Sequence, residues 1–304
     1  MLLDELDLSI IEELKADARQ PVRSIAHTLG LKRSTVRYRL NRLISEGILR
    51  IICRSEPKLL GYQFAIVLCM RTRADRITAV ADRLASLPTI KHISLSAGRY
   101  NIIAWAVYRD ESDLANFISK DLADISDISS IEIMQSFHRF KAYFQFEEET
   151  FSNNVPSQLS ELDLALIREM ERDPRQTITD LAKTLGCSHT AARNNLTKLI
   201  DNGIIRLFPI IDPIVVGFKG AVILIKPELD KVNTVASKFS SLDTTMHVSL
   251  ITGQWQIIVA VQFQDSTDLY NYISETISSI SGIIEFEVLP LLKTLKFSLA
   301  INTF

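Results

Sequence analysis

The feature that most constrains this chain is an internal duplication. The stretch ELDLSIIEELKADARQ at residues 5–20 matches ELDLALIREMERDPRQ at residues 161–176, an offset of 156 residues. Four glycine pairs continue the match, the last at an offset of 155: Gly30 and Gly186, Gly47 and Gly203, Gly61 and Gly217, Gly98 and Gly253. A period of this length indicates duplicated domains, because the repeats of solenoid proteins are only about 20 to 50 residues long.

Composition limits the class of protein. The chain has 304 residues, 47% of them hydrophobic, which is enough for several buried cores. Its 34 Lys and Arg against 36 Asp and Glu leave a net charge of -2, so any anion-binding surface must be local. Three scattered cysteines argue against a disulfide framework or a zinc site. The acidic start and the lack of an apolar run of about 20 residues predict a soluble, cytoplasmic, unprocessed protein without a membrane partner.

Each copy opens with a predicted amphipathic helix. In the first copy its apolar stripe has helical spacing: Leu6, Ile10, Ile11 and Leu14. Asp4 and Asp7 are placed to cap this helix, and Ser160 and Asp163 stand at the same positions of the second copy.

Two further helices follow. Pro21 is expected to begin the second helix and Gly30 to end it, while Ser34 begins a third that stops at Gly47. The short connection between them is the signature of a helix-turn-helix. The sequence ILRIICRSEP then reads as extended chain folding back, which predicts a winged version.

From Gly61 the hydrophobic period changes. The segments alternate in the order β-α-β-β-α-β, a ferredoxin-like arrangement with two helices on one face of an antiparallel sheet. The opposite face needs a cover, and the sheet of the other copy is the expected one. The fold class is therefore α+β, with two tandem copies of a winged helix-turn-helix followed by a ferredoxin-like domain. The predicted domains are 1–55, 60–146, a linker at 147–159, 160–211 and 216–304.

This order of parts resembles the Lrp/AsnC (feast/famine) family of transcriptional regulators. The matching stretches are LDLSIIEELKADARQPVRSIAHTLGLKRSTVRYRLNRLISEGIL with LSAGRYNIIAWAV, and LDLALIREMERDPRQTITDLAKTLGCSHTAARNNLTKLIDNGII with LITGQWQIIVAV. The resemblance implies a sequence-specific regulator of transcription that binds double-stranded DNA and is not an enzyme. It also implies modulation by an amino acid or other small effector. The mutual cover of the two sheets would make one chain a pseudo-dimer, and we expect two or more chains to associate into a homo-oligomer because DNA half-sites are normally read by symmetric pairs.

The third helix of the first copy supplies the predicted DNA contacts. When Val36 points inward, a polar and basic set projects away from the core, and two cations precede the helix. The predicted DNA-binding residues are Lys32, Arg33, Ser34, Thr35, Arg37, Tyr38, Asn41 and Arg42. Arg39 lies on the flank, where a salt bridge to the first helix is an equal alternative. A charged outward face can also be a merely solvated surface, but the helix-turn-helix context favours DNA.

The second copy has lost most of this charge. Residues 1–54 hold ten Lys or Arg and seven Asp or Glu, a net of 10 - 7 = +3. Residues 156–210 hold seven of each, a net of 7 - 7 = 0. We therefore expect a degenerate second helix-turn-helix that folds but contributes weakly to DNA affinity.

The resemblance also points to an effector loop between the two central strands of each sheet. Its predicted residues are Gly98, Arg99, Tyr100, Asn101, Gly253, Gln254, Trp255 and Gln256. The family's Gly-x-Tyr-Asp pattern has its glycine and aromatic residue here, but Asn101 and Gln256 replace the carboxylate that would pair with an amino group. The alternative is that these residues only form a tight turn and pack an interface.

A second class of protein has the same domain plan. Sirohaem decarboxylases are similar, and their ferredoxin-like domains hold a tetrapyrrole with His and Arg. The residues that would serve a tetrapyrrole enzyme or a haem-binding protein here are His92, His138, His247, Arg99 and Arg139. The basic third helix argues against this reading. The sequence shows no other catalytic arrangement or metal-ligand spacing, and we expect no cofactor.

Overall fold

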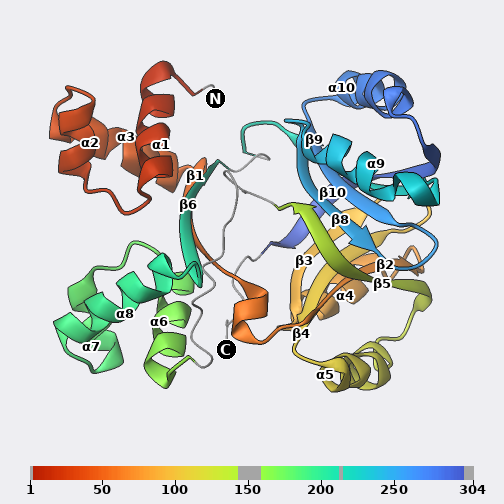
Figure 1. Ribbon diagram of the computed structural model, residues 1–304, viewed down its shortest axis with the longest axis horizontal. Helices are drawn as coiled ribbons and strands as arrows, with labels where there is room; N and C mark the ends of the chain where they lie inside the picture. Colours follow the sequence, from red (N-terminus) through yellow and green to blue (C-terminus); the bar gives the residue numbers. More distant parts are fainter. Residues whose placement is uncertain (1–2, 143–158, 212–214, 298–304) are drawn as a thin grey trace. The chain divides into compact units, whose positions relative to one another are not determined.

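The computed structural model describes residues 3–142, 159–211 and 215–297. The chain divides into two compact units (Figure 1). Among the described residues, the head unit comprises 3–60, 159–211 and 215–217, and the barrel unit comprises 61–142 and 218–297. The predicted linker at 147–159 lies, except for its last residue, outside the described residues.

The head unit contains two three-helix heads. The first head is formed by α1 (Glu5–Ala16), α2 (Val22–Thr28) and α3 (Arg33–Ser45). The second head is formed by α6 (Glu161–Arg172), α7 (Ile178–Leu185) and α8 (His189–Asp201). Each head has its own apolar core, and Val36, Leu40 and Leu43 of α3 are buried as predicted. The helix-turn-helix prediction is confirmed, with α3 beginning one residue before Ser34.

The predicted helix caps are present in both heads. Asp4 and Asp7 form a capping box at the start of α1, and Ser160 and Asp163 form one at the start of α6. Gly30 has a φ of +64°, a left-handed conformation that lets the chain turn sharply between α2 and α3. These local signals place the two helices of the motif correctly from sequence alone.

The strand that follows each head pairs with the other copy. β1 (Leu49–Ser55) and β6 (Ile205–Ile211) are the extended segments predicted after each head, and they pair with each other in a two-stranded antiparallel sheet. Ile52 lies opposite Phe208, its own counterpart at the offset of 156. This register places a local pseudo-twofold axis between the two residues. The strands also exchange core residues, since Cys53 packs in the second head and Ile211 in the first.

The barrel unit holds both βαββαβ domains, as predicted. The first consists of β2 (Phe64–Thr72), α4 (Ile77–Ala85), β3 (Ile90–Ser96), β4 (Ile102–Tyr108), α5 (Glu111–Asn116) with the π-helical η2 (Phe117–Leu122), and β5 (Ile128–Lys141). The second consists of β7 (Lys219–Pro227), α9 (Val232–Ser240), β8 (Thr245–Ile251), β9 (Ile257–Phe263), α10 (Ser266–Asn271) with the π-helical η4 (Tyr272–Ile277), and β10 (Ile283–Phe297). Short 3-10 turns occur at η1 (Pro57–Leu60) and η3 (Leu229–Lys231).

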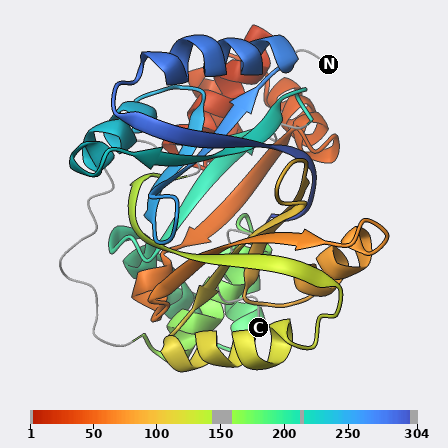
Figure 2. The same ribbon diagram turned by 90° about the vertical axis from the view of Figure 1, so that its right-hand side faces the viewer.

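The two sheets join into one closed barrel of order β10-β3-β4-β2-β5-β8-β9-β7. The long strands β5 and β10 make the joins, because the second half of each pairs with the other copy's sheet. Figure 2 shows the strands between the helical segment α5–η2, in yellow, and α10–η4, in blue. A core shared by both copies fills the barrel, which confirms that each sheet covers the other.

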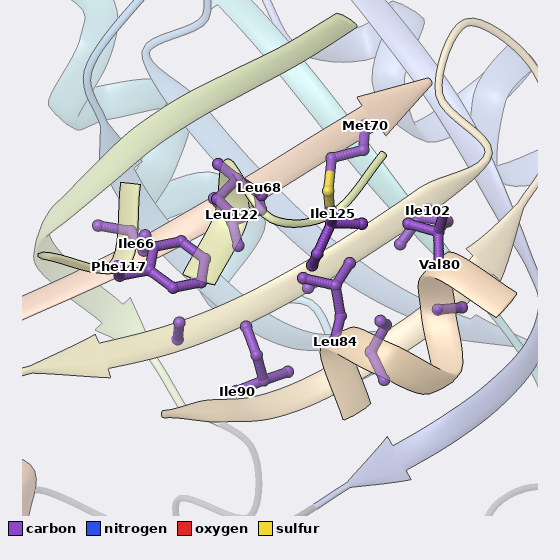
Figure 3. Packing of buried hydrophobic residues seen from close by; sticks show 14 of the residues in the cluster. Ile66, Leu68, Met70, Val80, Leu84, Ile90, Ile102, Phe117, Leu122 and Ile125 are labelled. Atoms are coloured by element: carbon purple, nitrogen blue, oxygen red, sulfur yellow. The ribbon is translucent and has the colours of Figure 1, made fainter. Parts of the chain in front are cut away.

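A separate core lies under the helices of each domain. In the first domain Leu84 of α4 packs with Ile66, Leu68 and Ile90 of the sheet (Figure 3). All four side chains are essentially excluded from solvent, and each contributes about 1.5 to 3 kcal/mol to stability by this burial. Among the helices of the described residues, none is long and apolar enough to cross a membrane.

Candidate nucleic-acid interface

The structure places most of the predicted DNA-binding residues on the open surface of α3. The exposed ones are Lys32, Arg33, Ser34, Arg37, Tyr38 and Asn41, and Thr35 is half-buried. The ring of Tyr38 is 69% exposed. The first three turns of α3 therefore offer cations, hydroxyls, an amide and an aromatic ring on one surface.

Two further arginines of α3 turn toward α1. Arg39 donates to Asp4 and, at 3.1 Å, to Asp7, which confirms the salt bridge that was one alternative for it. Arg42 donates to Asp7 across 2.5 Å and is only 27% exposed. Its predicted projection away from the core is wrong, because its long side chain folds back to the carboxylate of Asp7, which is 1% exposed. Arg42 thus holds α3 in place, and its contact with DNA stays a prediction.

The N-terminus of α3 has no side-chain cap. Its N-cap residue is Lys32, which makes no capping hydrogen bond, and the first turn holds no acidic residue. The equivalent residue of α8 is Ser188, whose hydroxyl accepts from the Ala191 amide at 3.1 Å. Free amides beside two cations are unfavourable for an isolated helix, but they suit the approach of a phosphate group.

The same contrast extends along both helix-turn-helix segments. Asp180 in the first turn of α7 is replaced by Ser24 in α2, and the capping Thr177 by Pro21. Residues 21–50 hold seven basic and one acidic side chain, a net of 7 - 1 = +6. Residues 177–206 hold four basic and two acidic, a net of 4 - 2 = +2. The positive charge of the molecule is therefore concentrated on the first head.

The second head nevertheless keeps a polar outer surface. From its N-cap to Lys198, the exposed side chains of α8 are Ser188, His189, Thr190, Arg193, Asn194, Thr197 and Lys198. The two arginines that pair with Asp7 have become Asn195 and Lys198. As a result one carboxylate oxygen of Asp163 is buried with no hydrogen-bond partner among the described residues.

The predicted effector loops lie against strands of the barrel. Gly98 and Gly253 have φ values of +113° and +111°, which favour glycine at these turns. Asn101 joins its loop to β2, since its amide bonds both backbone groups of Thr72 at 2.9 and 3.0 Å. Gln256 donates to the Gly253 carbonyl at 3.1 Å. Asn101 and Gln256, the two residues that replace the carboxylate of the family pattern, therefore stabilise the turns themselves.

The carboxylates at these loops come from the strands. Glu132 of β5 accepts from the Tyr100 hydroxyl and, at 3.1 Å, from the Gln254 amide of the other copy. Glu287 of β10 lies 3.5 Å from the guanidinium of Arg99, also of the other copy. Sequence reasoning missed both glutamates. The signal that could have found them was a carboxylate repeated at an offset of 155 within the last predicted strand of each copy.

Burial affects the ionisation of this cluster. Desolvation, followed by the hydrogen bond to Glu132, raises the pKa of Tyr100 to about 12. Desolvation also raises the pKa of Glu287, partly offset by Arg99. Among the described residues no cation pairs with Glu132, whereas Glu287 has one. Trp255 is 2% exposed, and its indole nitrogen has no partner in the described part of the chain.

The histidines considered for a tetrapyrrole have protein partners. His92 and His247 occupy equivalent places on β3 and β8, where the Nε2 atoms lie 2.7 Å from Ser94 Oγ and 2.8 Å from Ser249 Oγ. Desolvation lowers the pKa of His92 to about 4 and that of His247 to about 3, the latter also through Arg139. The His138 ring packs edge-on against Phe140 with the centroids 4.8 Å apart. Because of these contacts, none of the three histidines is an obvious ligand for a tetrapyrrole.

Comparison with known proteins accounts for nearly the whole chain. A winged helix-turn-helix DNA-binding model matches residues 3–50 and 159–206. A model of the Lrp/AsnC ligand binding domain matches residues 64–146 and 220–301. The chain belongs to the Lrp/AsnC family.

Its Lrp/AsnC relatives correspond to one copy each. The HTH-type transcriptional regulator LrpA of Pyrococcus horikoshii is 34% identical over 131 residues, 43% of this chain and 93% of that protein. The HTH-type transcriptional regulator Ptr1 of Methanocaldococcus jannaschii is 26% identical over 141 residues, 46% of this chain and 95% of that protein. The duplication therefore sets this Lrp/AsnC member apart from these two relatives.

One solved structure is similar over both copies. The siroheme decarboxylase NirDL superposes with a TM-score of 0.70 at 15% identity, covering 97% of this chain and 93% of that chain. The same enzyme in co-complex with an iron-uroporphyrin III analogue has a TM-score of 0.69 at 14% identity, covering 98% and 96%. At this identity the likeness shows a shared fold.

Proposed function

We propose that this Lrp/AsnC protein is a sequence-specific regulator of transcription that binds double-stranded DNA chiefly through its first head. The observation that supports this most strongly is the exposed, uncapped and basic N-terminal part of α3. The recognition helix of a helix-turn-helix inserts its N-terminal residues into the major groove. The exposed basic side chains of α3 lie at that same end of the helix. A cytoplasmic location and the absence of enzymatic activity belong to the same proposal.

The side chains divide into two groups by position. Lys32 and Arg33, at the start of α3, are placed for phosphate contacts, which supply affinity but little sequence information. Arg37 and Asn41, further along the exposed surface, have the chemistry to read guanine and adenine edges. Arg39 and Arg42 act indirectly by fixing α3 on Asp7.

The salt dependence of binding tests this division. The variant Lys32→Ser/Arg33→His copies the second head into the first. If both cations contact phosphates, the slope of log K against log salt falls by about 2 relative to the natural protein. The matched control Ser188→Lys/His189→Arg leaves the first head untouched. Binding to genomic DNA fragments with an unchanged slope in the first variant would contradict the phosphate assignment.

We further propose that the chain acts as a pseudo-dimer. The paired strands β1 and β6 and the shared barrel core support this, since each joins equivalent surfaces of the two copies. The expected homo-oligomer would add a second chain to this arrangement. Light scattering tests that expectation, and a stable monomer at micromolar concentration would contradict it.

An amino-acid effector is a proposal that rests on Glu132. This carboxylate has the charge that the loop motif itself lacks, and its present partners Tyr100 and Gln254 are neutral donors. If the ammonium group of an amino acid replaced these donors, it would form a charge-assisted hydrogen bond with the Glu132 carboxylate. In a thermal-shift assay against a panel of amino acids, the effector should raise the melting temperature of the protein. The variant Glu132→Gln should abolish that increase. Glu287→Gln is the matched control, because Glu287 is already paired with Arg99.

A tetrapyrrole-binding role is the alternative favoured by the whole-chain likeness to NirDL. The internal hydrogen bonds and lowered pKa values of His92 and His247 argue against it. Adding haem to the purified protein discriminates the two functions: a Soret band that disappears in His92→Gln or His247→Gln would favour the tetrapyrrole role.

A further inference from the structure

We infer that one chain reads an asymmetric operator, a duplex whose two half-sites differ in sequence, with α3 on one half-site and α8 on the other. The inference rests on the proposed DNA-binding function and specifies its substrate. It follows from two observations: the heads are joined as equivalent partners, and their exposed surfaces are chemically different.

The joining of the heads is reciprocal. Arg19 donates to the Gln176 carbonyl at 2.7 Å, and its counterpart Arg175 donates to the Gln20 carbonyl at 3.5 Å. The β1–β6 register is centred on Ile52 and Phe208, so the same two-fold operation relates the strands. Contacts of this isologous kind are those by which two identical subunits form a symmetric dimer.

The cores also tie the heads together. Cys53 of β1 is 3% exposed inside the core of the second head, and Ile211 of β6 packs against the core of the first. Ser55 at the end of β1 further donates to Glu171 of α6 across 2.5 Å. Each head therefore needs the other copy's strand to complete its core. The two reading helices are presented together, as in a dimer that places one helix on each half-site.

The surfaces they present are different. Position by position, α3 and its N-cap show Lys32, Arg33, Tyr38 and Asn41 where α8 and its N-cap show Ser188, His189, Asn194 and Thr197. Only one of the exposed arginines is shared, as Arg37 and Arg193. Because the donors and acceptors differ, the base pairs that satisfy one helix do not satisfy the other.

Compared with α3, α8 has fewer cations but keeps residue types that can recognise base edges. Arg193 and Asn194 are both exposed, and these are the side chains suited to guanine and adenine. The N-terminus of α8 offers less phosphate attraction, since its N-cap residue Ser188 is neutral and accepts from the Ala191 amide, whereas the N-cap residue of α3 is the cation Lys32. The second head is thus suited to discriminate sequence while the first supplies most of the affinity.

Selection from a random library tests the inference without any variant. The full-length protein is incubated with duplexes that carry about 30 random base pairs, enough for two half-sites one helical turn apart. Bound DNA is recovered and sequenced over several rounds. We expect a consensus of two different half-sites, A and B, in fixed order and orientation.

Affinities for designed duplexes then measure the asymmetry. The A–B duplex should bind about tenfold or more tightly than either A–A or B–B, since each mismatched base pair weakens binding by about 5- to 150-fold. Asn194→Ala should relax base preference in half-site B alone, and Asn41→Ala in half-site A alone. Circular dichroism of both variants confirms that they fold.

The outcomes separate this inference from the function on which it rests. A palindromic consensus, a single half-site, or equal affinity for A–A and A–B overturns the asymmetric operator and leaves the DNA-binding function standing. Failure to enrich any sequence overturns the proposed function and the inference with it.

Discussion

The two heads of this protein have the same fold and opposite local chemistry. The second head has the features of a stable helical domain, with side-chain caps on α7 and α8 and an acidic residue, Asp180, in the first turn of α7. The first head lacks caps on α2 and α3 and gathers cations where they oppose the helix dipole. Departures from local stability rules concentrate at functional sites, so the difference supports the proposal that the first head is the main DNA-binding element.

The two heads also differ in the ion pairs at their first helices, and here the first head has the more complete set. Asp7 is buried and bonded to both Arg39 and Arg42, whereas Asp163 is buried with one oxygen unpartnered in the described residues. The arginines that hold α3 in place were thus lost in the second head, while the carboxylate remained for its part in the capping box. The recognition helix of the first head is thus fixed to its first helix by ion pairs that the second head lacks.

The largest expected effect comes from removing the charge of the buried Asp7, with Asp163 as the matched position of the second head. Asp7→Asn should destabilise the first head by about 3 kcal/mol, because it leaves two arginines without their buried partner. Asp163→Asn should change stability by less than about 1 kcal/mol, since the residue has no ion pair to lose. Hydrogen exchange of α1 and α6, followed by mass spectrometry, reports each head separately. Equal losses of protection in both would show that the ion pairs do not distinguish the heads.

A smaller effect is expected in the barrel, where the copies agree. His92 and His247 have depressed pKa values of about 4 and about 3, so the unfolded chain takes up protons that the folded barrel does not. Stability should therefore fall as the pH decreases from about 6.5 toward 4, by about 2 to 3 kcal/mol per histidine. Denaturant titrations at several pH values measure this slope. The variants His92→Gln and His247→Gln should each flatten it to a similar extent, and an effect confined to one of them would break the symmetry of the barrel.

The smallest expected effect concerns the cap of α3. Lys32→Ser supplies the hydroxyl that Ser188 provides in α8, and should stabilise the first head by about 0.5 to 1 kcal/mol while it weakens DNA binding. Ser188→Ala should destabilise the second head by a similar amount. Hydrogen exchange at the start of each helix gives the measurement. A Lys32→Ser protein that is less stable than the natural one would contradict the view that the missing cap serves binding.

Much of this fold could be predicted because its signals are local. Caps such as Asp4 with Asp7, turn glycines such as Gly30, and the change of hydrophobic period after Gly61 lie within a few residues of the elements they define. The duplication extended these predictions to the second copy and suggested the shared core of the barrel. The exposed surface of α3 followed from the inward direction of Val36 alone.

The features that were missed depend on contacts between distant residues. Helical geometry set the direction of Arg42 from its backbone, but its long side chain follows the buried charge of Asp7, 35 residues away in sequence. The pairing of β1 with β6 is determined by two strands more than 150 residues apart, neither of which signals its partner. The roles of Glu132 and Glu287 depend on loops of the opposite copy, which no local pattern reveals.

The affinity of full-length Arg37→Ala for DNA, measured beside that of Arg193→Ala by fluorescence anisotropy on one duplex, tests the central claim most directly. These residues occupy equivalent exposed positions, so the comparison removes every difference except the head to which the arginine belongs. We expect Arg37→Ala to lose about 2 kcal/mol of binding free energy, roughly 30-fold in affinity, and Arg193→Ala to lose clearly less. Equal losses from the two substitutions would contradict the assignment of the first head as the main DNA-binding element.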